Sequence, residues 1–512
     1  MRGYLKRLLT TGAAYQAAEI VAKGLALITL PLYTAHVGPA GYGAYQALFT
    51  AVILVSIFAR LGVGEAFIRF YFDDHDEARR ERIARTATAT VAWTSTVVAV
   101  VACIFAAPLS ELLLGLSAGH SDPLLIDCAV VGVWAFTNLE MAYAQLRVDE
   151  RTRAYVVASG SNVALTIALT IALVVVDHQG ARGLLLGNFG ASAVVVVGLW
   201  WSLRRRFSLR IRAADLKAMM RFGLPTVPAD ASVYALQVAD RFYLYRTDSH
   251  AAAGDYAVAL QVATVVFVFV RGFQYAWPPL AYSIEGDETA ARLYAVVTTY
   301  FVLGTGVVVA AIALLGRWPI RILDHHFYAA HAALPWLALA WALYGLYQVV
   351  IVITGRARAT GRNVPATVAG LAVNIGLLVV LVPRSGAGLG IAGAAIALCG
   401  AYAVMLAIMH LLTRRLFAVR FEWTRLGSLV GLLAAVAVSG ELLLPTHGAA
   451  GLLLRALWLA WIPAALAAMR FFSPAERTQA RALVADARVR VTAFRRGGGV
   501  IEGFAEDPLK DL

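Results

Sequence analysis

The chain alternates long apolar runs with short polar connections along most of its length. An α-helix that crosses the hydrocarbon core of a bilayer needs about 20 mostly apolar residues. Runs of that length predict about fourteen transmembrane helices, and therefore an all-α, polytopic membrane protein. Their predicted ranges are 9–33, 44–68, 87–107, 124–146, 155–176, 183–203, 223–245, 254–281, 293–315, 333–354, 366–383, 388–413, 426–444 and 448–469.

Composition agrees with lipid as the surroundings of most of the chain. Of the 512 residues, 60% are hydrophobic and only 15% are charged, and the mean hydropathy is +0.71. The three cysteines (Cys103, Cys128 and Cys399) lie far apart inside apolar runs, so they predict neither a disulfide framework nor a metal site. We expect no cofactor and no metal.

The basic residues predict how the helices are oriented. If the N-terminus is cytoplasmic, most of the 44 Lys and Arg fall in the tails and loops on that side. This positive-inside pattern predicts that both termini are cytoplasmic. It accounts for the net charge of +13 without a nucleic-acid partner, so we expect none. The apolar run after Met1–Thr11 is too long for a signal peptide and is read as the first membrane helix.

The same pattern divides the chain into five parts. Residues 1–203 form an N-terminal lobe, 204–222 a basic amphipathic cytoplasmic linker, 223–413 a C-terminal lobe, 414–471 two further helices, and 472–512 a cytoplasmic tail. The linker is either a topology signal or a segment that contacts anionic lipid. The connections expected outside the membrane are too short to fold into a catalytic domain.

An internal repeat relates the two predicted lobes. Gly43–Arg60 reads GAYQALFTAVILVSIFAR and Gly254–Arg271 reads GDYAVALQVATVVFVFVR, so Gly, Tyr and Arg coincide at an offset of 211. The same register pairs Glu19 with Asp230. Matching acids and arginines inside apolar runs favour a parallel repeat, which many transporters use to build a site between related halves.

Basic residues within the predicted membrane helices are candidates for binding a substrate, because an ionisable side chain there needs a wet cavity or a partner. Arg60 and Arg271 occupy equivalent repeat positions, and Gln274 follows Arg271 by one helical turn. Lys23 follows Glu19 by four residues, which is also the spacing of a self-neutralising pair. Snorkelling to the interface is the structural alternative for the arginines. A cavity floored by these cations would suit phosphate oxygens.

A second group indicates ion coupling or gating. Pro225 and Pro228 are expected to break or bend the seventh helix, and Asp230 follows directly. Asp240 and Arg241 lie near the outer end of that helix, where the alternative is an interfacial cap. Together with Glu19, the two aspartates are the carboxylates expected to act if transport is coupled to an ion.

Enzyme motifs are lacking in the sequence. No HExxH, GxSxG or P-loop occurs, and Asp73-Asp74-His75-Asp76 reads as a solvated acidic cluster. His325, His326 and His331 are read as incidental loop residues. We therefore expect a protein that is not an enzyme.

Several motifs resemble the start of Wzx-type polysaccharide exporters of the multidrug/oligosaccharidyl-lipid/polysaccharide (MOP) flippase superfamily. The first is the turn Gly38-Pro39-Ala40-Gly41-Tyr42-Gly43, and the second is the helix end with Gly62 or Gly64, Ala66 and Arg69. The start of the second half is similar too, with GLPTVPAD, Asp240-Arg241, GDYAVALQVA and Pro278-Pro279. The resemblance covers the first twelve helices.

This resemblance implies two six-helix lobes in a V around a central cavity, with two additional C-terminal helices. It implies alternating access that moves an undecaprenyl-diphosphate-linked oligosaccharide from the inner to the outer leaflet of the bacterial cytoplasmic membrane. Membrane lipids, and a polymerase or ligase of the same pathway, are the implied partners. In glycan-flipping members, cavity Arg and Lys hold the diphosphate, a role that falls here to Arg60, Arg271 and Lys23.

Two other functions compete with this interpretation. A cation-coupled multidrug exporter shares the scaffold, but its cavity should be acidic or aromatic rather than cationic. A membrane glycan polymerase or ligase also has many helices, but such enzymes generally need a substantial external loop. The in-membrane charges favour an anionic substrate and leave the glycan, the energy source and the oligomeric state open.

Overall fold

The computed structural model describes residues 24–72, 76–114, 122–149, 151–204, 209–284, 286–356 and 363–472. Helices, with no strand, make up the regular structure of these residues. Their bounds are 24–36, α2 (Pro39–Arg60), α3 (Val63–Phe72), α4 (Glu77–Ile104), α5 (Ala106–Leu114), α6 (Pro123–Val148), α7 (Thr152–Thr170) with a π turn at Ile171–Val176, α8 (Gly180–Ser202), α9 (Ala213–Gly223), α10 (Val227–Thr247), α11 (His250–Ser283), α12 (Asp287–Leu315), α13 (Arg317–Arg321), a 3-10 segment His325–Ala332, α14 (Leu334–Arg356), α15 (Asn363–Leu381), α16 (Gly390–Thr413), α17 (Trp423–Leu443), α18 (Gly448–Ala460) and α19 (Ile462–Ala468).

The predicted all-helical membrane protein is confirmed. Within the described ranges, twelve helical spans are long and apolar enough to cross a membrane. The helix at 24–36 and α10 occupy the places of the other two predicted spans. The first of these two is only partly described. The second carries Asp230, Asp240 and Arg241, which lower its hydropathy.

The prediction of one continuous helix over 44–68 is wrong. Helix α2 ends at Arg60, and α3 begins at Val63 after a left-handed turn in which Leu61 has φ 53° and Gly62 has φ 68°. A Cβ atom on Gly62 would lie 2.0 Å from the carbonyl oxygen of Gly223, so only glycine allows this approach. An apolar run carries no sign of such a turn, which is why the count of hydrophobic residues missed it.

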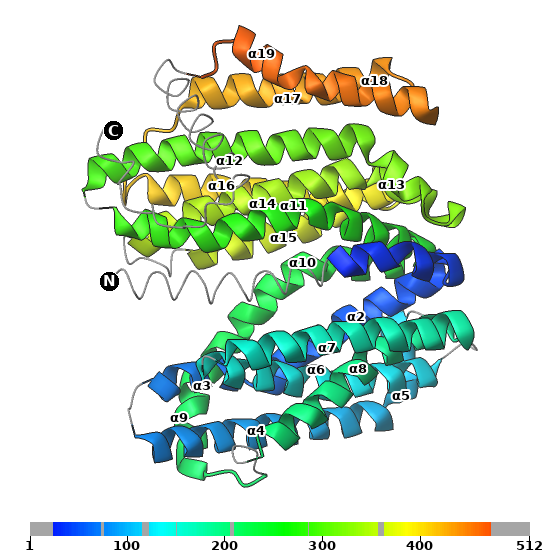
Figure 1. Ribbon diagram of the computed structural model, residues 1–512, viewed down its shortest axis with the longest axis vertical. Helices are drawn as coiled ribbons and strands as arrows, with labels where there is room; N and C mark the ends of the chain where they lie inside the picture. The colour runs from blue at the N-terminus through cyan, green and yellow to red at the C-terminus, as the bar shows by residue number, and fades with distance from the viewer. Residues whose placement is uncertain are drawn as a thin grey trace, which may run out of the picture.

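The helices form two lobes, with a further pair beside the second lobe. In Figure 1, α2–α8 lie in the lower half and α11–α16 in the upper half, while α10 crosses obliquely between them. Helices α17–α19 lie along the top of the view, next to α12. The linker helix α9 packs on α3 and α4 of the first lobe, where Met219 is buried.

The two lobes meet most closely where α2 crosses α11, at the two repeat-related glycines. A Cβ atom on Gly43 would lie 2.2 Å from the carbonyl oxygen of His250, and one on Gly254 would lie 2.0 Å from that of Pro39. The contact is therefore reciprocal, as a pseudo-twofold axis between equivalent helices requires. Next to it, Tyr42 packs edge-on against Phe327 with ring centroids 6.0 Å apart. Backbone contact and aromatic packing close the lobes at the end predicted to face outward.

An ionic cluster around the buried side chain of Arg455 connects α18 to the second lobe. Arg455 is 0% exposed and donates a 2.7 Å hydrogen bond to the carboxylate of Glu441 and a 3.0 Å one to the carbonyl oxygen of Leu314 on α12. Arg317 also pairs with Glu441. Loss of Glu441 would leave the fully buried Arg455 without its carboxylate partner, whereas Glu441 itself keeps 38% of its side chain exposed. This cluster makes the C-terminal helices part of the second lobe.

We predict that Gly254→Ala destabilises the protein by about 1–3 kcal/mol, because the new methyl group has to push two backbones apart. The measurement is thermal unfolding of the purified protein in detergent. Gly272→Ala is the control on the same helix, since a Cβ atom there meets nothing within 4 Å. If both variants unfold at the wild-type temperature, the α2–α11 contact does not hold the lobes together.

Candidate functional site

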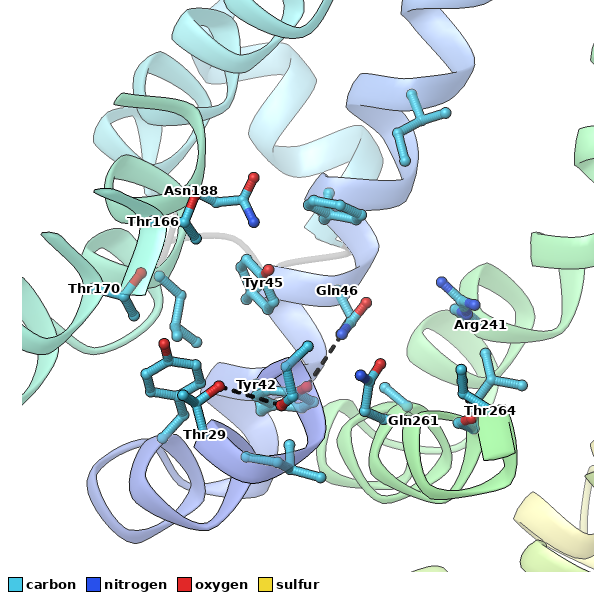
Figure 2. Close-up of a pocket in the computed structure, with 18 of the residues that line it drawn as sticks. Thr29, Tyr42, Tyr45, Gln46, Thr166, Thr170, Asn188, Arg241, Gln261 and Thr264 are labelled. Carbon is cyan, nitrogen blue, oxygen red and sulfur yellow. Dashed lines mark hydrogen bonds between the residues drawn. The ribbon is translucent and has the colours of Figure 1, made fainter. Parts of the chain in front are cut away.

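A cavity of about 460 Å³ lies between the two lobes. Its walls come from 24–36, α2, α7 and α8 on one side, and from α10, α11 and α14 on the other. Figure 2 shows labelled side chains from both groups of helices facing a common space, among them Tyr45, Gln46 and Asn188 opposite Arg241 and Gln261. We call this space the central cavity.

Uncharged polar residues make up half of the described lining of the central cavity. Hydroxyls and amides alternate with aromatic rings, and no described lining residue is an Asp or Glu. The polar lining residues other than Arg241 are Thr29, Tyr33, Tyr42, Tyr45, Gln46, Asn162, Thr166, Thr170, Asn188, Tyr234, Gln237, Gln261 and Thr264. Such a surface offers donors and acceptors to a hydroxylated ligand and does not offer a counter-ion to a cationic one.

Arg241 is the charged residue among the described lining of this cavity. Its Nη1 donates a 3.1 Å hydrogen bond to Oγ1 of Thr50 on α2, so the side chain bridges the two lobes. The neighbouring Asp240 is 1% exposed. Its carboxylate accepts hydrogen bonds from the Tyr256 hydroxyl and from the backbone N–H of Arg241. The sequence pair at 240–241 thus divides into a buried acid and a cavity-lining base.

A second cavity of about 300 Å³ lies farther along α11 and α14, within the second lobe. Arg271 and Gln274 both line it, and Arg271 donates a 3.4 Å hydrogen bond to the amide oxygen of Gln274. The guanidinium carbon also lies 5.0 Å from the ring centroid of Phe267. We call this space the Arg271 cavity. It lies toward the end predicted to face the cytoplasm.

Arg60 is not among the described lining residues of either cavity, whereas Arg271 lines the second. It ends α2, and it is an electrostatic neighbour of Asp230 on α10, as is Glu65 on α3. Repeat-related arginines therefore have different surroundings, because α2 stops at Arg60 whereas α11 continues beyond Arg271 to Ser283.

The two prolines lie at an interruption between α9 and α10. Leu224–Thr226 forms a 3-10 turn that contains Pro225, and Pro228 is in the first turn of α10. The expected break in the helix is present at this point.

Two of the residues singled out in the sequence, Glu19 and Lys23, lie outside the described residues.

Buried donors without acceptors mark both cavities. The Nε atoms of Arg241 and Arg271 and the indole Nε1 of Trp341 have no hydrogen-bond partner in the described part of the molecule. Nε of Arg60 is also buried and has no hydrogen-bond partner among the described residues. A buried donor that lacks a partner costs about 1–3 kcal/mol, so a ligand rich in acceptor oxygens would be favoured by these groups.

Sequence inspection missed the uncharged part of this site. Amides such as Gln46, Asn188 and Gln261 sit singly within apolar runs and produce no charge signal. It also missed Asp255, a buried carboxyl beside Gly254 whose Oδ1 has no partner among the described residues. Its position inside a predicted membrane helix was a usable signal, but Asp255 was considered only as part of the repeat segment Gly254–Arg271.

One exposed group of residues has the geometry of metal ligands. Ligand atoms of Asp324, His325 and His326 lie within 4.8 Å of one another on the surface turn before α14. Hydrogen bonds from the backbone N–H and the ring of His326 lower the pKa of the Asp324 carboxyl. These contacts explain the arrangement without an ion, and we assign no metal to it.

The fold is that of the MOP transporters. The structure matches a lipid II flippase, MurJ, in an inward closed conformation with a TM-score of 0.71 and 12% identity over 88% of this chain and 97% of the other. It also matches a multidrug resistance MATE family transporter of the MOP superfamily. The inward-facing form gives a TM-score of 0.59 and 16% identity over 78% and 95% of the two chains, and the outward-facing form gives 0.54 and 16% over 82% and 96%.

A family model described as polysaccharide biosynthesis protein matches residues 9–285, more than half of the chain. The protein therefore belongs to this polysaccharide biosynthesis family of membrane transporters. Fold and family indicate a transporter or flippase rather than a catalytic enzyme. No curated protein matches the sequence significantly.

We predict that the central cavity is wet. In a variant without the three native cysteines, Asn188→Cys and Gln261→Cys should react with a water-soluble maleimide in detergent. Val258→Cys is the control on α11, because Val258 is 0% exposed. The measurement is the mass shift of the labelled protein over time. Equal, slow labelling at positions 258 and 261 would mean that water does not reach the described lining.

Proposed function

We propose that the protein is a flippase that moves an undecaprenyl-diphosphate-linked oligosaccharide from the inner to the outer leaflet by alternating access. The observation that carries this proposal is the chemistry of the two cavities. Their described lining contains Arg241 and Arg271 with orphaned Nε atoms, many hydroxyl and amide groups, and no carboxylate.

Physical chemistry supports a lipid-linked anion as the substrate. A diphosphate and a polar glycan cannot cross the hydrocarbon core unaided, whereas a polyprenyl tail can stay in lipid beside the protein. Guanidinium groups form bidentate, charge-assisted hydrogen bonds with phosphate oxygens. In this proposal Arg271, supported by Gln274, holds the diphosphate, and the central cavity holds the glycan.

We propose a different role for Arg60 in transport. Because it ends α2 outside both cavities, we assign it to the entrance on the cytoplasmic side, where it attracts the diphosphate before Arg271 binds it. Lys23, which lies outside the described residues, remains a proposed ligand of the diphosphate. The positive-inside pattern of the basic loops supports cytoplasmic termini. We propose the cytoplasmic membrane of a bacterium as the location and movement from the inner to the outer leaflet as the direction.

Coupling to an ion is proposed at the carboxylates of the seventh helix. Asp240 is buried next to Arg241, which bridges to Thr50 of the other lobe. A change of charge at Asp240 would therefore alter a contact between the lobes, as alternating access requires. Asp230 and Glu19 remain further candidates, and Pro225 and Pro228 supply the flexible start of the helix that moves.

Partners follow from the substrate. A glycan polymerase or ligase must consume the flipped oligosaccharide at the outer surface, and membrane lipids surround the protein throughout. A cation-coupled exporter is the second candidate function, favoured by the structural match to the MATE transporter.

The test is transbilayer movement of a fluorescent undecaprenyl-diphosphate oligosaccharide in proteoliposomes. We expect wild type to flip it, and Arg60→Gln/Arg271→Gln to lose at least roughly tenfold in rate, because each arginine supplies charge-assisted hydrogen bonds worth about 1.5–3 kcal/mol. Arg246→Gln/Arg384→Gln, which alters two exposed arginines of the loops predicted to lie outside, is the matched control.

Two results would contradict the proposal. If wild type leaves the lipid in place but moves an organic cation down an ion gradient, the protein is an exporter. If wild type flips the lipid and the double variant flips it as fast, the two arginines do not bind the diphosphate.

A further inference from the structure

We propose that Trp341 and Phe267 form a sugar-binding platform at the boundary between the two cavities, which separates the glycan from the diphosphate. This inference rests on the proposed function and names the part of the site that recognises the first sugar. Both residues line the central cavity, and both contact groups that line the Arg271 cavity.

Three aromatic rings make this boundary. Phe267 on α11 and Trp341 on α14 have ring centroids 4.5 Å apart and an interplanar angle of 58°. Trp341 meets Tyr344 edge-on at 5.8 Å, and Tyr344 lines the Arg271 cavity. The two cavities share no residue among their described lining. An aromatic wall therefore divides the central cavity, where Arg241 is the charged residue among the described lining, from the Arg271 cavity.

The position of Arg271 fits this division. Its guanidinium carbon lies 5.0 Å from the Phe267 ring centroid, on a side chain one helical turn from Phe267. The attraction of a cation to an aromatic face holds Arg271 against the wall, while its buried Nε lacks an acceptor among the described residues. A diphosphate bound at Arg271 would place the attached sugar next to this wall.

Trp341 itself has an unused hydrogen-bond donor. Its indole Nε1 is buried and has no acceptor among the described residues. Buried indole N–H groups usually find a partner, so a ligand oxygen that reached this covered N–H would satisfy a donor that is otherwise unpaired. Sugars supply such oxygens, and their C–H faces pack on aromatic rings.

The surroundings of the platform select a neutral or acidic sugar. Gln261 and Thr264 on α11, both visible in Figure 2, line the same cavity. They can donate to and accept from hydroxyl groups. No carboxylate is present in the described lining to pair with an ammonium group, and Arg241 is the charge that lies nearby in the cavity. The platform is therefore unsuited to a sugar with a free amine.

The experiment compares two lipids that differ only in the glycan. Purified wild-type protein in nanodiscs is titrated with undecaprenyl diphosphate and with undecaprenyl diphosphate that carries a neutral disaccharide. Wild type should bind the second lipid more tightly. Trp341→Ala should lose roughly tenfold in affinity for the glycan-bearing lipid, since a stacking contact and a hydrogen bond are removed, and should keep its affinity for the bare lipid.

Further variants distinguish loss of the platform from loss of the fold. Trp341→Phe keeps a ring but lacks the N–H, and should lose less affinity than Trp341→Ala. Trp336→Ala is the control, because Trp336 lies on the same helix with 41% of its surface exposed and does not line either cavity. Arg271→Gln should weaken both lipids by similar factors, because it removes the diphosphate contact.

The outcomes distinguish the two proposals. If wild type binds neither lipid, the proposed function fails. If wild type binds both lipids equally, or if Trp341→Ala and Trp341→Phe keep the full advantage of the glycan-bearing lipid, the flippase proposal stands and the sugar platform is overturned.

Discussion

The close approach of α2 and α11 at Gly43 and Gly254 is the contact on which the rest of the structure depends. Each glycine lies against the backbone of the other helix at distances that no side chain would allow. Helices in lipid gain little from the hydrophobic effect when they associate, so backbone packing at small residues becomes the available source of affinity. The lobes are joined at this point, and a cavity lies between them along the same pair of helices.

Such a cavity has to be lined with polar groups and still be compatible with a membrane. An arginine buried within the membrane is costly, and the arginines here offset that cost to different extents. Arg455 does so completely, with a carboxylate and backbone carbonyls as partners. Arg241 and Arg271 do so in part, through Thr50 and through Gln274 with Phe267, and keep an orphaned Nε. Full pairing fits a structural role, and partial pairing fits a group that awaits a ligand.

Sequence predicted the class of fold because length and hydropathy are local properties of each helix. It also found the repeat, and the structure places the repeat-related glycines in reciprocal contact. It could not see the left-handed turn at Leu61–Gly62, which depends on a distant glycine at position 223. Nor could it find the amides of the central cavity or the aromatic pair Phe267–Trp341, because single polar or aromatic residues in apolar runs mark a site only after the helices are packed. Charged residues were found by sequence, but which of them share a cavity is a property of the packed lobes.

The arrangement along α11 links these features into one path. From its start, this helix presents Gly254 to the first lobe, then Gln261 and Thr264 to the central cavity, then Phe267 at the boundary and Arg271 beyond it. From Gln261 onward these positions are three or four residues apart, so they lie on one side of the helix. A motion that separates the lobes at one end must pivot about a contact that persists, and the glycine contact is fixed by backbone atoms. The aromatic boundary is made of side chains, which change rotamer far more readily than packed backbones separate. In the proposed transport cycle, the path between the two cavities would therefore open by side-chain motion within the second lobe, whereas exposure of the central cavity to either side of the membrane would require movement of whole lobes.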